Sequence, residues 1–62
     1  MFAIYEVLDN GRKRLHSDVR FDTPQGGVDF FGEAVCHFEI EPDNSAADIF
    51  TIYGGLFVVE KA

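Results

Sequence analysis

The chain has 62 residues, a net charge of −6 and a single cysteine. A chain of this length forms one domain, residues 1–62, near the lower limit for independent folding, and a lone cysteine excludes an internal disulfide. The acidic balance argues against direct contact with nucleic acid or with an anionic membrane, because both require a basic surface. Seven Phe and two Tyr supply enough apolar area for a folded domain.

The beginning of the chain shows no targeting signal. Met1 leads directly into FAIYEVL, without a basic region, a long apolar core or a small-residue cleavage site. No apolar run approaches the roughly 18 residues of a membrane span. We therefore expect a reduced, cytoplasmic setting.

The first third of the chain predicts a β-hairpin. Residues 2–8 form a β-type run, and Asn10-Gly11 is typical of a type I′ turn, in which both central residues have positive φ. Residues 13–21 alternate as a returning strand, with Leu15, Val19 and Phe21 on one face. The register stays open: a two-residue loop pairs Phe2, Ile4 and Glu6 with the face of Leu15, whereas a three-residue loop substitutes Ala3, Tyr5 and Val7.

Residues 23–33 predict a short helix, with an irregular loop as the alternative. Thr23 is a suitable N-cap, and Pro24 suits the first helical position. Val28 and Phe31 fall at helical spacing on one side, but Gly26 and Gly27 each cost up to about 1 kcal/mol in a helix interior.

The remainder predicts three strands. Residues 34–41 alternate, which places Ala34, Cys36, Phe38 and Ile40 inward. Residues 42–48 indicate a loop, and residues 49–53 and 56–60 flank Gly54-Gly55 as a second hairpin. The expected fold is α+β: a small, mainly antiparallel sheet of four to five strands with one short helix.

Several strands of the expected sheet are apolar on both faces, and one short helix covers only one face. The other face must be hidden by curling of the sheet, by a second copy of the chain or by a partner.

No group of residues indicates catalysis. Cys36 and His37 are adjacent, so strand geometry points them to opposite faces and they do not pair as nucleophile and base. Cys36 lies in the apolar register and is expected in the core. The chain has no metal-ligand spacing and no phosphate-binding glycine pattern. We expect no enzyme, no metal and no cofactor.

The strongest functional signal is uncompensated acidity, since residues 21–60 contain eight carboxylates and no Lys or Arg. Glu39 and Glu41 lie at i and i+2 of a strand, about 6.6–6.8 Å apart on one face, close to the spacing of successive phosphates. Asp29 and Glu33, at i and i+4, are expected on one side of the helix. Six carboxylates are the candidate partner-binding residues: Asp29, Glu33, Glu39, Glu41, Asp43 and Asp48.

The basic residues gather elsewhere. Arg12, Lys13, Arg14 and Arg20 lie on the first hairpin and form one basic corner beside a broad acidic remainder. The alternative explanation for the acidity is that it only keeps a small, apolar protein soluble.

The chain resembles, as a general type, the small acidic phage-encoded anti-CRISPR proteins. The resemblance covers the whole compact α+β chain, with its acidic stretch from Asp22 to Glu60, and includes no shared motif. It implies binding to a type I CRISPR surveillance complex in the host cytoplasm, at the surface that otherwise holds target DNA.

The expected function is a non-enzymatic inhibitor that blocks DNA binding by a basic nucleic-acid-binding protein or complex through a DNA-mimicking acidic surface. The alternative is a small protein–protein interaction module or homodimer that acts through an apolar sheet face.

Overall fold

The computed structural model describes all residues, 1–62, and contains one five-stranded antiparallel sheet and one short helix. The elements in chain order are β1 (Phe2–Val7), β2 (Lys13–Leu15), α1 (Pro24–Phe31), the 3-10 turn η1 (Gly32–Ala34), β3 (Val35–Ile40), β4 (Ala46–Thr51) and β5 (Leu56–Lys61). The strand order across the sheet is β2-β1-β5-β4-β3, so β2 and β3 are its two edges. The predicted α+β fold with a mainly antiparallel sheet is confirmed.

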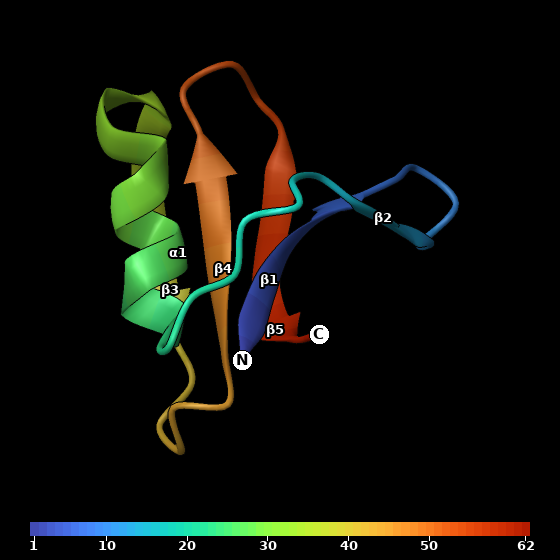
Figure 1. Cartoon of the computed structure of the whole chain (residues 1–62). Coiled ribbons are helices and arrows are strands. Elements are labelled where there is room, and N and C mark those ends of the chain that lie inside the picture. The colour runs from blue at the N-terminus through green and yellow to red at the C-terminus, as the bar shows by residue number, and fades with distance from the viewer.

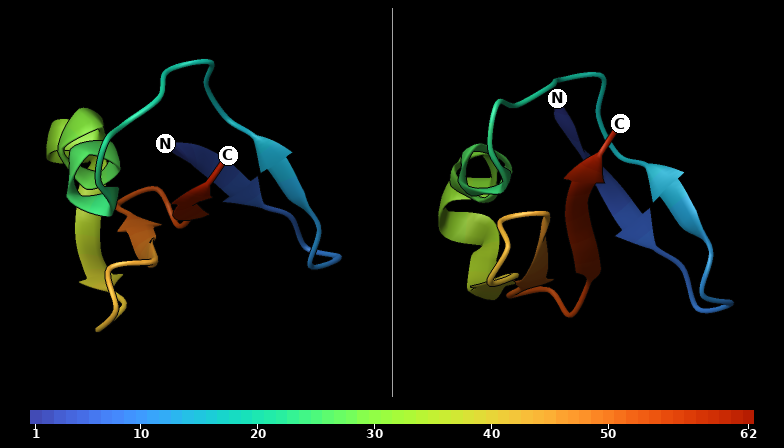
Figure 2. Two further views of the ribbon diagram at one scale, coloured as in Figure 1. Left: turned by 60° about the horizontal axis from the view of Figure 1, so that its bottom comes forward. Right: turned by 90° about the horizontal axis from the view of Figure 1, so that it is seen from below.

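The helix and the connection that leads to it lie on one face of the sheet. Figure 1 shows α1 in front of β3, with the segment between β2 and α1 crossing in front of the sheet. In the two views of Figure 2 the opposite face carries no other segment. No helix of the fold is long and apolar enough to cross a bilayer.

The β1–β2 hairpin closes with the three-residue loop. Tyr5 pairs with Leu15 and Val7 with Lys13, and the Leu8 N–H donates to the Arg12 carbonyl at 2.8 Å. Within the loop only Gly11 has a positive φ, 82°, so the expected type I′ turn with two such residues is wrong. A three-residue loop needs one left-handed residue at its end, and glycine meets that need at the least cost.

The second half of the first hairpin is shorter than its alternating sequence predicts. β2 ends at Leu15, and the predicted strand over 13–21 is wrong beyond that residue. The chain then crosses the sheet toward α1, and Phe21 returns to form an isolated bridge with Phe2. Phe21 packs against the core from the helix side, whereas Val19 remains 42% exposed, so the expected common face is lost.

The helix forms as predicted, and the loop alternative is excluded. The Thr23 hydroxyl oxygen accepts from the Gly26 N–H at 3.2 Å, which satisfies one of the free N–H groups of the first turn. α1 ends at Phe31, because Gly32 with φ 56° turns the chain into η1. Asp29 and Glu33 therefore do not share one continuous helix, which corrects that expectation.

A bulge changes the faces of β3. The pairs Val35–Thr51 and His37–Phe50 show that the register shifts between Val35 and His37. An extra residue breaks the alternation of the strand, so that Val35 and Phe38, three residues apart, share the core face. Val35 consequently packs against the core, and Cys36 is exposed, so the core position expected for this thiol is wrong.

β4 begins earlier than predicted. Residues 46–48 belong to the strand Ala46–Thr51, so the predicted loop over 42–48 is shorter. Ala47, Ile49 and Thr51 are buried and alternate with less buried residues, which is the period of a strand with one face in the core.

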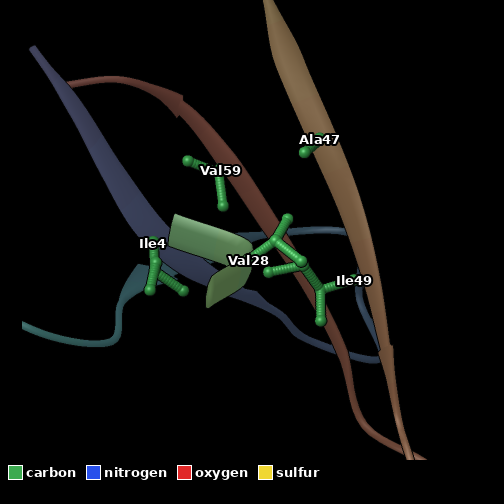
Figure 3. Close-up of a cluster of buried hydrophobic side chains, with 5 residues drawn as sticks. All are labelled: Ile4, Val28, Ala47, Ile49 and Val59. Atoms are coloured by element: carbon green, nitrogen blue, oxygen red, sulfur yellow. The ribbon is translucent and has the colours of Figure 1, made fainter. Parts of the chain in front are cut away.

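The core lies between the sheet and the helix. Figure 3 shows its five buried side chains, Ile4, Val28, Ala47, Ile49 and Val59, which come from β1, α1, β4 and β5. A Cβ on Gly27 would lie 2.6 Å from Val59 Cγ2. The glycine that weakens the helix therefore permits its close approach to β5.

The other face of the sheet is partly covered by its own side chains. Val58 and Ala3 lie on this face and are 6% and 0% exposed, while Leu15 and Leu56 are 42% and 36% exposed. The sheet keeps two free edges and does not close into a barrel.

Candidate protein-interaction surface

The six predicted carboxylates lie on the β3 side of the molecule, in α1, in η1 and in the β3–β4 hairpin. Their positions are Asp29 in α1, Glu33 in η1, Glu39 in β3, Glu41 and Asp43 after it, and Asp48 in β4. All are exposed except Asp48, which is half-buried. We call this set the acidic edge.

The acidic edge carries the whole net charge of the protein. The chain has eleven carboxylates, and the five outside the edge equal the five Lys and Arg residues in number. None of those basic residues lies between residues 21 and 60. The remaining charge of −6 therefore belongs to one side of the molecule and is not balanced locally.

Three of the five basic side chains have partners on the β2 side of the molecule. Lys13 Nζ lies 3.0 Å from Glu60 Oε2, and the Arg14 guanidinium pairs with Glu6, which is opposite to it in the β1–β2 ladder. The Arg20 guanidinium donates to the carbonyls of Ser17 and Val19. The predicted basic corner is thus partly neutralised, and neither ion pair involves the acidic edge.

Glu39 and Asp48 face each other directly across the β3–β4 ladder. Side chains directly opposite on neighbouring strands have Cβ atoms about 4.5–5.5 Å apart, and like charges in that position are destabilising. Glu41 extends the row, because its N–H donates to the Ala46 carbonyl at 2.9 Å and continues the same ladder. Three carboxylates therefore share the face of the sheet that the helix leaves uncovered.

Sequence analysis alone missed the pairing of Glu39 with Asp48. It placed Asp48 in a loop, whereas β4 holds this residue between the buried Ala47 and Ile49. The alternation of the segment AADIFT is the signal that indicates a strand there.

Two neighbouring groups shape the ends of this row. The His37 ring stacks on Phe50, its partner across the ladder, with centroids 4.2 Å apart and planes 7° from parallel. At the other end, the hydroxyl and the backbone N–H of Ser45 bond the Asp43 carboxylate and lower its pKa from the ordinary value of 3.8. The N–H to Oδ1 distance is 3.0 Å.

The other two carboxylates lie in α1 and in η1. Gln25 Nε2 donates to Asp29 Oδ1 at 2.8 Å, so Asp29 is fixed in position but not neutralised. Glu33 is exposed and lies in η1, next to the start of β3. The acidic edge therefore continues from the uncovered face of the sheet around β3 to the helix side.

The structure has one hollow, and it lies away from the acidic edge. Its volume is about 700 Å³, and it lies between the tips of the β1–β2 and β4–β5 hairpins. Glu6 and Asp9 are its titratable residues, and Glu6 is paired with Arg14. No three His, Cys, Asp or Glu side chains converge as metal ligands would.

The chain matches no protein-family model, no curated protein and no solved structure.

Proposed function

We propose that this protein is a non-enzymatic inhibitor that occupies the basic groove of a nucleic-acid-binding protein or complex with its acidic edge. A type I CRISPR surveillance complex is the candidate target, on the strength of the general resemblance to small acidic anti-CRISPR proteins. The observation that carries the proposal is the Glu39–Asp48 pair, two like charges directly opposite in a ladder, neither of which forms an ion pair.

The cost of this pair is the reason to connect it with function. A fold of 62 residues has a small free energy of unfolding, and an unfavourable cross-strand pair lowers it further. A groove lined with Lys and Arg removes that repulsion on binding. Binding then gains both the attraction of the partner and the relief of the strain between the carboxylates.

The spacing of the carboxylates supports replacement of phosphates. Glu39 and Glu41 are two residues apart on one strand face, about 6.6–6.8 Å, which is close to the separation of successive phosphates along a nucleic-acid strand. Asp43, Glu33 and Asp29 continue the negative surface around the edge.

The test is a reversal of charge with two readouts. Glu39→Lys should weaken partner binding, and because it converts the like-charge pair with Asp48 into an opposite-charge pair, it should raise the free energy of unfolding by about 0.2–1 kcal/mol. Reversal of Glu39 and Glu41 together should abolish inhibition of target-DNA binding while the fold remains intact. Inhibition is measured by electrophoretic mobility of target DNA, and stability by urea denaturation.

The control matched to Glu39→Lys is Asp18→Lys, which changes the net charge by the same amount on an exposed residue whose side chain makes no hydrogen bond or ion pair. It should leave inhibition unchanged. Full inhibition by the double variant of Glu39 and Glu41 would refute the proposal.

A second proposal is a small interaction module that acts through apolar contacts. It is favoured by the tip of the β4–β5 hairpin, where Tyr53 is 86% and Ile52 is 56% exposed. Binding through this tip should tolerate about 0.5 M salt and be lost in Tyr53→Ser, whereas binding through the acidic edge should be screened at that ionic strength.

A further inference from the structure

β3 is a sheet edge whose outer backbone groups have no partner. Glu41 bonds the Ala46 carbonyl through its N–H, and hydrogen-bonded pairs alternate along an antiparallel ladder. Glu39 and Glu41 therefore turn their N–H and C=O groups toward β4, and Phe38 and Ile40 turn theirs to the free side. No hydrogen bond outside the β3–β4 ladder involves residues 36–40.

The helix does not close this edge. α1 packs over the helix-side face of β3, and four consecutive residues of the strand, from Cys36 to Glu39, are exposed. Phe38 is 41% exposed although it pairs with the buried Ile49 on the core side of the sheet. The edge thus offers unpaired backbone groups together with an incompletely covered aromatic ring.

The side chains along the edge alternate in chemistry. Glu39 and Glu41 lie on the uncovered face, and Phe38 and Ile40 lie on the face of the core. In a strand added beside β3, every second side chain would lie on the uncovered face. The one opposite Glu39 would extend the cross-strand row that Glu39 forms with Asp48. The side chains between them would lie next to Phe38 and Ile40.

We propose that the β3 edge binds an extended segment of a partner protein, in which basic and apolar residues alternate, as a sixth strand of the sheet. Charge complementarity selects Lys or Arg at the positions beside Glu39 and Glu41, and the apolar side chains of the segment cover Phe38. Main-chain hydrogen bonds to Phe38 and Ile40 supply affinity, as in other complexes formed by strand addition.

The same charges disfavour pairing with a second copy of this chain. An antiparallel pairing of two β3 edges that aligns Phe38 with Ile40 sets Glu39 opposite Glu39, and one centred on Ile40 sets Glu39 opposite Glu41. A pairing centred on Phe38 meets the bulge at residues 35–37. Acidic residues and a bulge are common devices against pairing between identical edges, and they leave a basic strand unhindered.

This inference rests on the proposed function, because it assumes a basic partner. It specifies that an extended segment of this partner binds beside β3. A proline-free segment of about five residues is sufficient, because the regular part of the edge extends only from His37 to Glu41.

The experiment compares two short synthetic peptides of equal composition, one with Arg and Val in alternation and one with the same residues in two blocks. The alternating peptide should bind at least about tenfold more tightly by fluorescence anisotropy, because only it can place its charges on one face while forming two or more backbone hydrogen bonds. In hydrogen exchange it should protect the amides of Phe38 and Ile40. Equal affinity of the two peptides, or no new protection at these amides, would overturn the inference.

A chemical variant distinguishes the contribution of the backbone hydrogen bonds to peptide binding from that of the carboxylates. The chain is short enough for total synthesis, and N-methylation of Phe38 removes one outward donor without touching the β3–β4 ladder or any carboxylate. It should lower the affinity for the alternating peptide about fivefold or more and leave that for the block peptide unchanged. The unmodified synthetic chain and the circular dichroism spectrum control for folding.

The two proposals fail in different ways. If the double charge reversal abolishes inhibition but both peptides bind alike, strand addition is wrong and the acidic inhibitor stands. If the double variant still inhibits, the proposed function fails whatever the peptides do. Protection of the Phe38 and Ile40 amides without peptide, together with a dimer in sedimentation, would show that a second copy occupies the edge and would overturn the inference.

Discussion

Asp43 shows how a single residue of the acidic edge keeps its charge. Ser45 donates from its hydroxyl and its backbone N–H to this exposed carboxylate in the β3–β4 turn, which lowers the pKa of Asp43. Within the same turn Asn44 has a φ of 60°, a conformation that Asn tolerates better than most residues because its short polar side chain can bond locally. The turn is therefore built to hold a carboxylate next to Glu41.

The lowered pKa has a definite consequence for pH dependence. A carboxyl group whose pKa is lower in the folded state contributes stability above its unfolded pKa, here 3.8, and loses it as the pH falls through the lower folded value. Ser45→Ala removes the hydroxyl but keeps the N–H bond, so it should raise the pKa of Asp43 part of the way toward 3.8, as measured by carbon NMR titration. Ser17→Ala, on the other side of the molecule, should not change it. An unchanged pKa in Ser45→Ala would contradict the assigned cause.

At the scale of elements, the β1–β2 and β4–β5 hairpins, at one end of the sheet, have the same type of loop. The Leu8–Arg12 and Thr51–Gly55 pairs each close a three-residue loop, and Gly11 and Gly54 end these loops with φ of 82° and 86°. The Thr51 hydroxyl oxygen also accepts from the Gly55 N–H at 2.9 Å. The register that brings Glu39 and Asp48 together is set by a third turn, between β3 and β4, where the Glu41 N–H donates to the Ala46 carbonyl.

The contact of α1 with β5 gives the second prediction at this scale. Gly27→Ala should destabilise the protein by about 1–3 kcal/mol, because its Cβ would lie 2.6 and 2.8 Å from the two methyl groups of Val59. In Gly26→Ala the nearest contact is Phe21 Cβ at 3.3 Å, and a gain in helix propensity of about 1 kcal/mol opposes it. We expect that variant to lie within about 1 kcal/mol of the parent by urea denaturation. Equal stability of the two variants would show that the close approach is not what requires glycine.

At the scale of the whole molecule, charge is separated across the sheet. The β2 side holds both ion pairs, and the β3 side holds six carboxylates without a cation. Repulsion within the β3 side opposes folding, and two exposed ion pairs contribute only about 0–1 kcal/mol each in return. A protein with this distribution is more stable when its acidic side is screened or bound.

Screening should therefore stabilise the free protein. Raising the salt concentration from about 0.05 M to about 0.5 M shortens the screening length to a few ångströms and should raise the melting temperature by several degrees. The increase should be smaller in Glu39→Lys, which relieves the repulsion by itself. A melting temperature that falls with salt would show that the ion pairs of the β2 side outweigh the repulsion of the acidic edge.

Local signals in the sequence determine the start of the helix, the positions of two hairpins and the acidic character of the surface. Thr23 and Pro24 determine where the helix begins, since capping and a preset φ act within one turn. Asn10-Gly11 and Gly54-Gly55 indicate both hairpins, and the absence of Lys and Arg from residues 21–60 establishes an acidic surface. These features depend on neighbours in the chain, so the sequence alone reveals them.

Only the tertiary structure determines which side chains of β3 are buried and which residues pair between neighbouring strands. The bulge at residues 35–37 exchanges Val35 and Cys36 between core and solvent, because packing under α1 outweighs simple alternation. The end of β2 at Leu15 follows from the path that the chain must take to reach the helix. The opposition of Glu39 and Asp48 and the free edge of β3 follow from the register and order of strands, which long-range packing selects and local sequence does not encode.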